Sequence, residues 1–330
     1  MTKKRKNRNT SKRKDIITMH LTDLVKRYAG NPLLTQDDLP GADAVFNAGA
    51  VKFKDKYILL VSVSIPGKAG NGRAIHVAES NDGIAFKIRE TPFIAPEQSG
   101  PFTEFDYDIC DPRITPLDGT YYITYPAHLP GIGVVGIMGK TDDFVNFERL
   151  SIAAMPWNRV PVLFPEKING MYWRLDRPMF NDNGTLWTSQ SRDLEFWGRH
   201  HLLARAQRQV WNSMKLGPSG IPIKTSRGWL VIYHAVAGGG MSTPIYHQAA
   251  MVLKLDDPNT VLARPDEYIL APKMEYERHG RVPNVVFSCG HIVEPDGQVK
   301  LYYAGADTCI CLATFHAEEM ADACCRLAAK

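Results

Sequence analysis

Hydrophobic and polar positions follow one short pattern that occurs five times along this chain. An apolar run leads into a tight polar turn, and a second run of apolar and aromatic residues follows the turn. The five copies cover residues 48–61, 112–125, 162–175, 227–234 and 296–303. Three of the turns are Asp-Gly or Asn-Gly pairs, which accept the positive φ angles that two-residue hairpin turns require. Each copy is therefore predicted to be a β-hairpin.

The spacing of these hairpins predicts how they assemble. Successive turns lie about 50 to 70 residues apart, which suits one propeller blade per copy with extended connecting loops. The chain is therefore predicted to be all-β, a five-bladed β-propeller with short N- and C-terminal extensions. A β-sandwich with coincidental turns is the alternative, although sandwiches seldom need 330 residues.

The composition predicts a soluble globular protein that buries a large core, with 44% hydrophobic and 22% charged residues. No apolar stretch approaches the ~20 residues of a membrane span, so no membrane partner is expected. The cysteines have no paired metal-ligand spacing, and no secretory signal is found, so free thiols and a cytoplasmic location are expected. The six cysteines are Cys110, Cys289, Cys309, Cys311, Cys324 and Cys325.

The two ends of the chain differ from its body. Residues 1–16 form a basic tail that is expected to be disordered, with contact to RNA or an anionic surface as the alternative. The eight Lys and Arg residues of this tail exceed the net charge of +4, so the body is mildly acidic and needs no nucleic acid. Residues 17–330 are predicted to form a single catalytic domain. Residues 317–323 indicate a short helix that packs on the last blade or mediates self-association.

Asp111 is a candidate for chemistry because it directly precedes Pro112 at the start of the second hairpin. Proline restricts the residue before it to extended backbone, which predicts a carboxylate aimed from a strand start instead of a mobile loop tip. The alternative is an ordinary structural turn, since Asp is common in turns.

The residues around Asp111 resemble a known family. Cys110-Asp111-Pro112-Arg113, with residues 118–122, is similar to the Glu-Asp-Pro-Arg motif of the mannoside phosphorylases of glycoside hydrolase family 130, which are five-bladed propellers. Similar segments cover nearly the whole body, at residues 27–28, 31–35, 46–50, 78–83, 163–168, 177–178, 193–198, 215–217, 228–230, 233–234, 283–287 and 303–308.

The resemblance implies an inverting phosphorolysis of a β-mannoside by inorganic phosphate, which gives α-mannose 1-phosphate and a shortened glycan or a free sugar. Asp111 is then the general acid, and in the family its proton is thought to pass through a mannose hydroxyl. An inverting hydrolase needs a second carboxylate to activate water, whereas phosphate is already an anionic nucleophile. The reaction needs no cofactor and no metal.

The resemblance also implies two sets of binding residues. Cationic and polar side chains are expected to bind phosphate, namely Arg159, Arg177, Lys215 and His234, with Tyr246 nearby. Three polar side chains are expected to bind mannose hydroxyls, namely Asn47, Arg73 and Asp307. Three aromatic residues are candidates for stacking on a sugar face or for packing within the blades, namely Tyr107, Tyr125 and Trp157.

Three positions depart from the family pattern. Cys110 stands where the family usually has Glu, Ser62 where it tends to have Arg, and Asp176 where many members have His. A neighbouring carboxylate that would tune Asp111 is absent, and one sugar or phosphate contact is lost at residue 62. The departures predict a divergent branch with altered acceptor preference.

Two other functions remain alternatives: an inverting β-mannosidase of the same fold, and a noncatalytic glycan-binding propeller. The mannosidase is favoured if the cationic residues do not converge in space. The expected partners are a β-mannoside oligosaccharide and inorganic phosphate, with a homo-oligomer as a further possibility. The sequence leaves open a β-1,2 or β-1,4 linkage and the identity of the acceptor.

Overall fold

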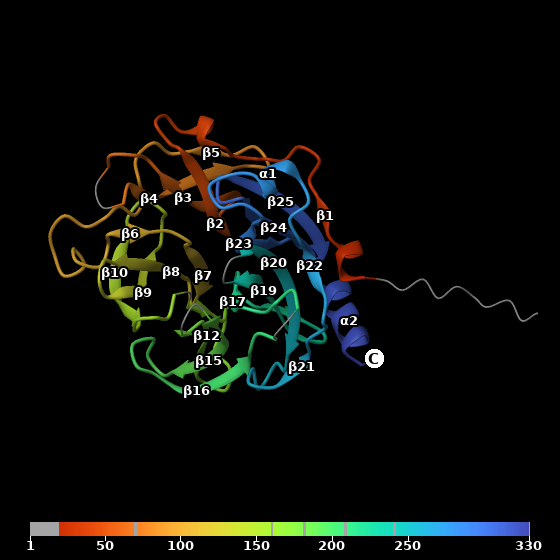
Figure 1. Ribbon diagram of the computed structural model, residues 1–330. Helices are drawn as coiled ribbons and strands as arrows, with labels where there is room; N and C mark the ends of the chain where they lie inside the picture. Colours follow the sequence, from red (N-terminus) through yellow and green to blue (C-terminus); the bar gives the residue numbers. More distant parts are fainter. Residues whose placement is uncertain are drawn as a thin grey trace, which may run out of the picture.

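The structure, a computed structural model, describes residues 20–68, 71–159, 161–180, 183–207, 210–239 and 242–329. The basic tail predicted at residues 1–16 lies outside them. Within the described residues the strands form five sheets, arranged as a ring around a central axis (Figure 1). Each of the five predicted hairpins lies in a different sheet. The five-bladed propeller is therefore confirmed, and the sandwich alternative is wrong.

The first two blades follow one another along the chain. The first has the order β2-β3-β4-β5, with bounds Ala44–Phe53, Lys56–Ser64, Arg73–Ser80 and Lys87–Ile88. The second contains β6 to β10, with bounds Asp108–Ile109, Arg113–Leu117, Thr120–Leu129, Gly133–Thr141 and Glu148–Ala154. The middle strands β3 and β9 are buried along nearly their whole length, because each blade is covered by a neighbour on both faces.

The third and fourth blades share a stretch of chain. The third has the order β11-β12-β15-β16, with bounds Val162–Leu163, Tyr172–Asp176, Leu186–Ser191 and Trp197–Ala204. The short strands β13 and β14, Met179–Phe180 and Asn183–Gly184, leave this region and join the fourth sheet. The rest of the fourth sheet is β17 to β22, with bounds Lys215–Pro218, Ile223–Thr225, Gly228–Gly239, Ser242–Leu253, Val261–Ala263 and Tyr268–Leu270.

The fifth blade closes the ring by combining both ends of the chain. Its strands β23 (Val286–Val293), β24 (Gln298–Gly305) and β25 (Cys309–His316) are consecutive, and β1 (Lys26–Arg27) adds to β25 as the outer strand. Because this pairing joins residues at opposite ends of the sequence, the ring is held by backbone hydrogen bonds as well as by side-chain packing.

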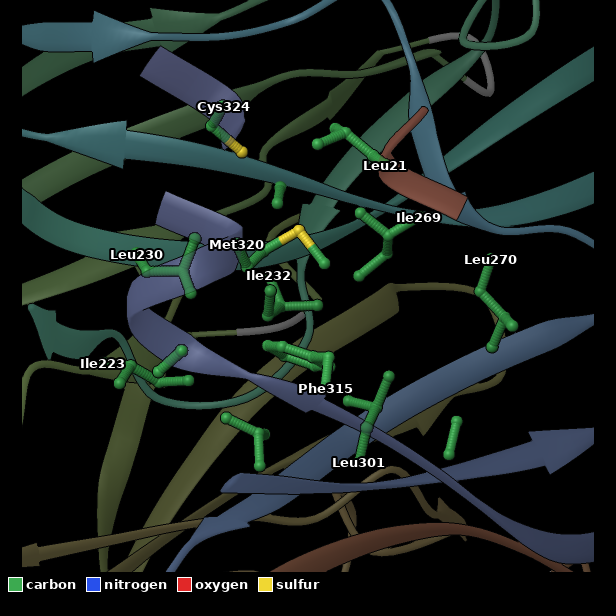
Figure 2. Close-up of a cluster of buried hydrophobic side chains, with 14 of the residues drawn as sticks. Leu21, Ile223, Leu230, Ile232, Ile269, Leu270, Leu301, Phe315, Met320 and Cys324 are labelled. Atoms are coloured by element: carbon green, nitrogen blue, oxygen red, sulfur yellow. The ribbon is translucent and has the colours of Figure 1, made fainter. Parts of the chain in front are cut away.

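The chain ends in α2 (Ala317–Ala328), which covers the stretch where the sequence indicates a terminal helix. The helix packs over the fourth and fifth blades, where Met320 and Cys324 belong to one buried cluster with Leu230 and Ile232 (Figure 2). The described part of the chain also forms three shorter helices, η1 (Leu21–Leu24), η2 (Gln36–Asp38) and α1 (Glu275–Arg278). All six cysteines are free thiols. No helix among the described residues is long and apolar enough to span a membrane.

Two kinds of turn set the blade geometry. Asp118 and Asn169, each followed by glycine, have φ angles of 52° and 53°, as the hairpin turns predicted there require. A second turn recurs in the first three blades, after β4, β9 and β15. In each, an Asp carboxylate accepts hydrogen bonds from the backbone N–H groups two and three residues further on, and a Ser or Thr hydroxyl donates to it. These aspartates are Asp82, Asp143 and Asp193.

Candidate active site

One end of the propeller axis contains a pocket of about 450 Å³ to which all five blades contribute. The residues predicted from scattered positions of the sequence converge there. Eight of the nine predicted site residues line this pocket: Asn47, Arg73, Asp111, Arg159, Arg177, Lys215, Tyr246 and Asp307. The ninth, His234, contacts the pocket through Arg177. The convergence follows from the fold, because β2, β7, β17 and β23 all begin at or near this end of the axis.

Asp111 lies in the wall of this pocket and is only 3% exposed. The Asn47 amide donates a hydrogen bond of 2.7 Å to its Oδ1, and Arg159 Nη2 lies 3.3 Å from its Oδ2. Burial alone would raise the pKa of Asp111, but the charges of Arg159 and Arg113 and the Asn47 hydrogen bond outweigh it. The net effect holds the pKa of this carboxyl below its ordinary value.

The backbone of Asp111 is not extended, contrary to the prediction made from Pro112. Its φ angle is 50°, in the left-handed region, which few residues besides glycine, Asn and Asp adopt. Two contacts hold this conformation. The Asp111 N–H donates to Ser62 Oγ at 2.9 Å, and Arg113 Nη1 donates to the Asp111 carbonyl at 2.6 Å.

Arg113 is a site residue that sequence reasoning did not assign. Its side chain is buried, and it donates to the backbone carbonyls of Ser219 at 3.1 Å and Pro218 at 3.4 Å. It therefore ties the Asp111 backbone in the second blade to the fourth blade. The available signal was its place in the motif, directly after Asp111-Pro112.

The cationic side chains occupy one side of the pocket, next to Asp111. Arg159 contacts the carboxylate and also lies 3.6 Å from the Cys110 sulfur, and Arg177 and Lys215 line the same wall. Arg177 Nη1 donates to His234 Nε2 at 2.6 Å, so the buried imidazole is neutral with Nε2 as the acceptor. Burial, followed by the charge of Arg177, lowers the pKa of His234 well below its ordinary value.

Gly217, which has no side chain, leaves room for the Arg177–His234 pair. A Cβ atom on Gly217 would lie 2.5 Å from Arg177 Cδ and 2.6 Å from the His234 ring, so only glycine allows both side chains to pass. Burial, followed by the positive charge of Arg159, lowers the pKa of Arg177 to about 9. Such a pKa indicates a buried concentration of positive charge, which an anion in the pocket would relieve.

Asp307 is a second carboxylate in the same pocket, and its environment acts in the opposite direction. Burial and the negative charge of Asp111 raise the pKa of Asp307 to about 7, against the charges of Arg159 and Arg73. Asp111 is therefore ionised in the free protein at neutral pH, while Asp307 holds a proton for part of the time. Two neighbouring carboxyls whose pKa values are shifted in opposite directions are typical of active sites.

Comparison with known proteins identifies the family. The model of glycoside hydrolase family 130, described as β-1,4-mannooligosaccharide phosphorylase, matches residues 3–326 of the chain. This chain belongs to glycoside hydrolase family 130. The β-1,4-mannooligosaccharide phosphorylase of Ruminococcus albus is 33% identical over 310 residues, which cover 91% of this chain and 90% of that protein. The 4-O-β-D-mannosyl-D-glucose phosphorylase of Bacteroides fragilis is 32% identical over 341 residues, which cover 96% and 84%.

A solved structure of the same family agrees with the fold. The β-1,2-mannobiose phosphorylase of Listeria innocua, in complex with β-1,2-mannobiose, aligns with a TM-score of 0.80 and 29% identity over 90% of this chain and 98% of that one. The protein is thus an enzyme of the β-mannoside phosphorylase family, with the family's propeller.

Two of the three departures from the family 130 pattern have a structural role here. Ser62 Oγ donates to the Asn47 carbonyl at 3.1 Å and accepts from Asp111, so it links two pocket residues. Asp176 is buried and accepts from Arg174 at 3.0 Å and from the Asn158 amide at 2.9 Å. Asn158 Oδ1 in turn accepts from the Arg177 N–H, so Asp176 supports the backbone of Arg177. Cys110 is buried beside Arg159, and burial raises the pKa of its thiol.

The three aromatic candidates have different places in this family 130 structure. Trp157 lines the pocket and is 51% exposed, so it is available to a sugar face. Tyr107 is exposed and is outside the pocket lining. Tyr125 is excluded as a stacking residue, because it is fully buried in the core of the second blade and donates to Asp106 at 3.2 Å. Strand alternation along β8 points it into the interface between blades.

Proposed function

We propose that this enzyme catalyses the inverting phosphorolysis of β-mannosides, with Asp111 as the general acid. The observation that carries the proposal is the convergence of Arg159, Arg177 and Lys215 on the pocket wall beside Asp111. A phosphate oxygen attacks the anomeric carbon of the mannosyl residue on the face opposite the leaving group. The glycosidic bond breaks, and the proton of Asp111 reaches the leaving oxygen, directly or through a sugar hydroxyl. The products are α-mannose 1-phosphate and the shortened acceptor.

The roles of the remaining residues follow from where they lie. Arg159, Arg177 and Lys215 would bind the phosphate oxygens, with His234 holding the Arg177 guanidinium in place. Asp307 and Arg73, which is paired with Asp108 at 2.9 Å, would bind mannose hydroxyls. Asn47 donates to Asp111, so its main role would be to orient the acid, with its Oδ1 left for the substrate. Tyr246 lines the pocket and would form part of its wall.

Hydrolysis by an inverting β-mannosidase is the second candidate, because the pocket contains two carboxylates besides Asp111, of which Asp108 is paired with Arg73. Asp307 would have to act as the base that activates water. A pKa of about 7 lies near the operating pH and would suit such a base, so the pKa of Asp307 does not decide between the two reactions. The cationic wall decides, because it has no function in hydrolysis, and phosphorolysis is the better supported reaction.

The substrate class is proposed at the level of a β-1,4- or β-1,2-linked manno-oligosaccharide or mannosyl-glucose. The deciding experiment incubates the purified enzyme with β-1,2- and β-1,4-mannobiose and with β-mannosyl-glucose, with and without inorganic phosphate. Phosphate-dependent α-mannose 1-phosphate is the expected product. Free mannose in equal amounts with and without phosphate would establish the mannosidase instead.

A further inference from the structure

The hydrogen bonds around Asp111 raise a question about its proton. A general acid must carry a proton when the leaving oxygen departs. In the structure one carboxylate oxygen accepts from the Asn47 amide at 2.7 Å and the other faces Arg159 Nη2 at 3.3 Å. An amide nitrogen and a guanidinium are donors that cannot accept a hydrogen bond. An oxygen that carries the proton accepts more weakly from either donor and finds in neither an acceptor for its own proton, so both contacts favour the ionised form and the free site holds Asp111 as a carboxylate.

Arg159 is the contact that an incoming substrate can change. It is the cation nearest the carboxylate, and it lines the pocket together with Arg177 and Lys215. Asn47 has no such alternative, because its backbone carbonyl is held by Ser62 and its amide points at Asp111. An oxyanion bound among the three cations would compete with Asp111 for the Arg159 guanidinium, since guanidinium groups bind phosphate in a bidentate manner.

We propose that binding of an oxyanion at Arg159, Arg177 and Lys215 draws Arg159 away from Asp111 and thereby drives a proton onto Asp111. The inference rests on the proposed function, because it assumes that phosphate is the anion. The proton comes from solvent, or from phosphate that arrives as the monoanion. It is later given to the leaving oxygen, so the carboxylate is regenerated and pairs with Arg159 again when mannose 1-phosphate leaves. Arg159 thus binds the anion and also controls the protonation of Asp111, so the acid carries its proton only when the nucleophile is present.

The electrostatics of the pocket agree with this order of events. Burial favours the neutral form of Asp111, and Arg159 is the largest of the influences that lower its pKa. When the charge of Arg159 is neutralised by an anion, burial is opposed only by weaker influences, and the pKa rises. The groups that interact with Asp111 from the surrounding elements are Asn47, Arg73, Cys110, Arg113, Arg159, Arg177, Tyr246, Cys289 and Asp307.

Asp307 is the group that must be separated from Asp111 in any test, because an anion would raise its pKa as well. Its pKa of about 7 means that it is already largely protonated at about pH 6. Proton uptake measured at this pH therefore occurs mainly on a group that is ionised in the free site. Asp111 is that group. His234 stays neutral at this pH, since its pKa is lowered well below the ordinary value.

The test is calorimetric titration of the enzyme with sulfate and with phosphate at about pH 6, in two buffers of different ionisation enthalpy, which gives the protons taken up per anion bound. Sulfate is the cleaner probe, because it has no titration in this range. We expect uptake approaching one proton with the wild type and none with D111N, which keeps the cations and still binds sulfate. D307N should retain the uptake, and R159Q should bind sulfate more weakly and take up fewer protons per anion.

The outcomes separate this inference from the function on which it rests. Sulfate and phosphate binding to the wild type without proton uptake would overturn the coupling and leave phosphorolysis standing. Uptake that persists in D111N and disappears in D307N would assign the proton to Asp307 and also overturn it. Failure of both anions to bind the wild type would overturn the proposed phosphate site and the coupling together.

Discussion

The inner strands have different kinds of side chain around their two ends, charged and polar at the pocket end and mainly apolar at the other. At the pocket end, β2 and β23 present Asn47 and Phe287 to a charged site. At the other end the same strands line a cavity of about 400 Å³, together with β7 and β18, and its lining is mainly apolar. The lining residues there are Ala50, Val51, Lys52, Pro116, Ile221, Pro222, Ile223, Lys224, His291, Ile292 and Val293. The same strands therefore line a charged pocket at one end of the axis and a mainly apolar cavity at the other.

Positive φ angles occur at both ends, for different reasons. At the turn end they fall on Lys54, Asp118 and Asn169, where tight hairpins demand them. At the pocket end they fall on Asn47 and Asp111, which lie outside hairpin turns, and on Asp307, which lies in the turn that joins β24 to β25. Strain of about 1–3 kcal/mol per residue persists only where surrounding contacts enforce it. At the pocket end it places polar side chains in the site, so substitutions there should affect turnover more than stability.

The largest expected effect is that of D111N on turnover. Loss of the general acid should lower kcat by about 10²- to 10⁴-fold, because the leaving oxygen then departs unprotonated. The Tm should change little, since Asn tolerates a positive φ and can still accept from Asn47. Release of α-mannose 1-phosphate and thermal unfolding measure the two quantities. D118N is the matched change at the turn end and should leave kcat unaltered; near-normal turnover of D111N would remove Asp111 from the mechanism.

R177K should have the next largest effect. A lysine keeps the positive charge but loses the planar fork and the bond to His234, so kcat/KM for phosphate should fall about 10- to 100-fold. The comparison uses phosphate titrations at saturating mannoside. K224R exchanges a cation at the opposite end, where Lys224 pairs with Glu166 at 2.7 Å, and should change nothing. Equal phosphate kinetics in R177K and the wild type would place the phosphate elsewhere.

Asp307 gives the pocket end a pH-dependent cost that the turn end lacks. Because burial and the charge of Asp111 raise its pKa to about 7, the folded protein holds a proton that the unfolded chain releases above about pH 4. Folding stability attributable to this group is therefore full below about pH 4 and is lost as the pH rises to 7. D307N should reduce the fall in Tm between about pH 5 and pH 8.

Asp82 provides the control for that experiment. Hydrogen bonds from the Ser80 hydroxyl and from backbone N–H groups lower the pKa of Asp82 to about 2, so its stabilising effect is complete by about pH 5 and does not change between pH 5 and pH 8. D82N should lower Tm by the same amount at both pH values. If Tm fell by the same amount between about pH 5 and pH 8 in D307N as in the wild type, the raised pKa of Asp307 would be wrong.

The two ends also differ in how far the sequence predicts them. The turns at Asp118-Gly119 and Asn169-Gly170 were predictable because the residues that close a hairpin lie next to each other. The pairing of β1 with β25 was not, since a two-residue strand has no local pattern and depends on ring closure. The left-handed backbone of Asp111 was missed because Ser62, which accepts from its N–H, is distant in the sequence, and because Arg113 is held in place by carbonyls of the fourth blade. For Tyr125 the sequence left sugar stacking and blade packing both open, because its packing partners decide which way β8 faces.

The smallest expected effect is that of G170A at the turn end. Gly170 has a φ of 75°, and a Cβ atom there would meet no other atom within 4 Å, so the substitution adds backbone strain alone. The cost should be about 1 kcal/mol, or roughly 2 °C in Tm for a chain of this length, with kcat unchanged. G198A adds the same atom in open space without a positive φ and should leave Tm unchanged. A loss of turnover in G170A would show that strain at the turn end reaches the pocket, so that the inner strands couple the two ends instead of separating them.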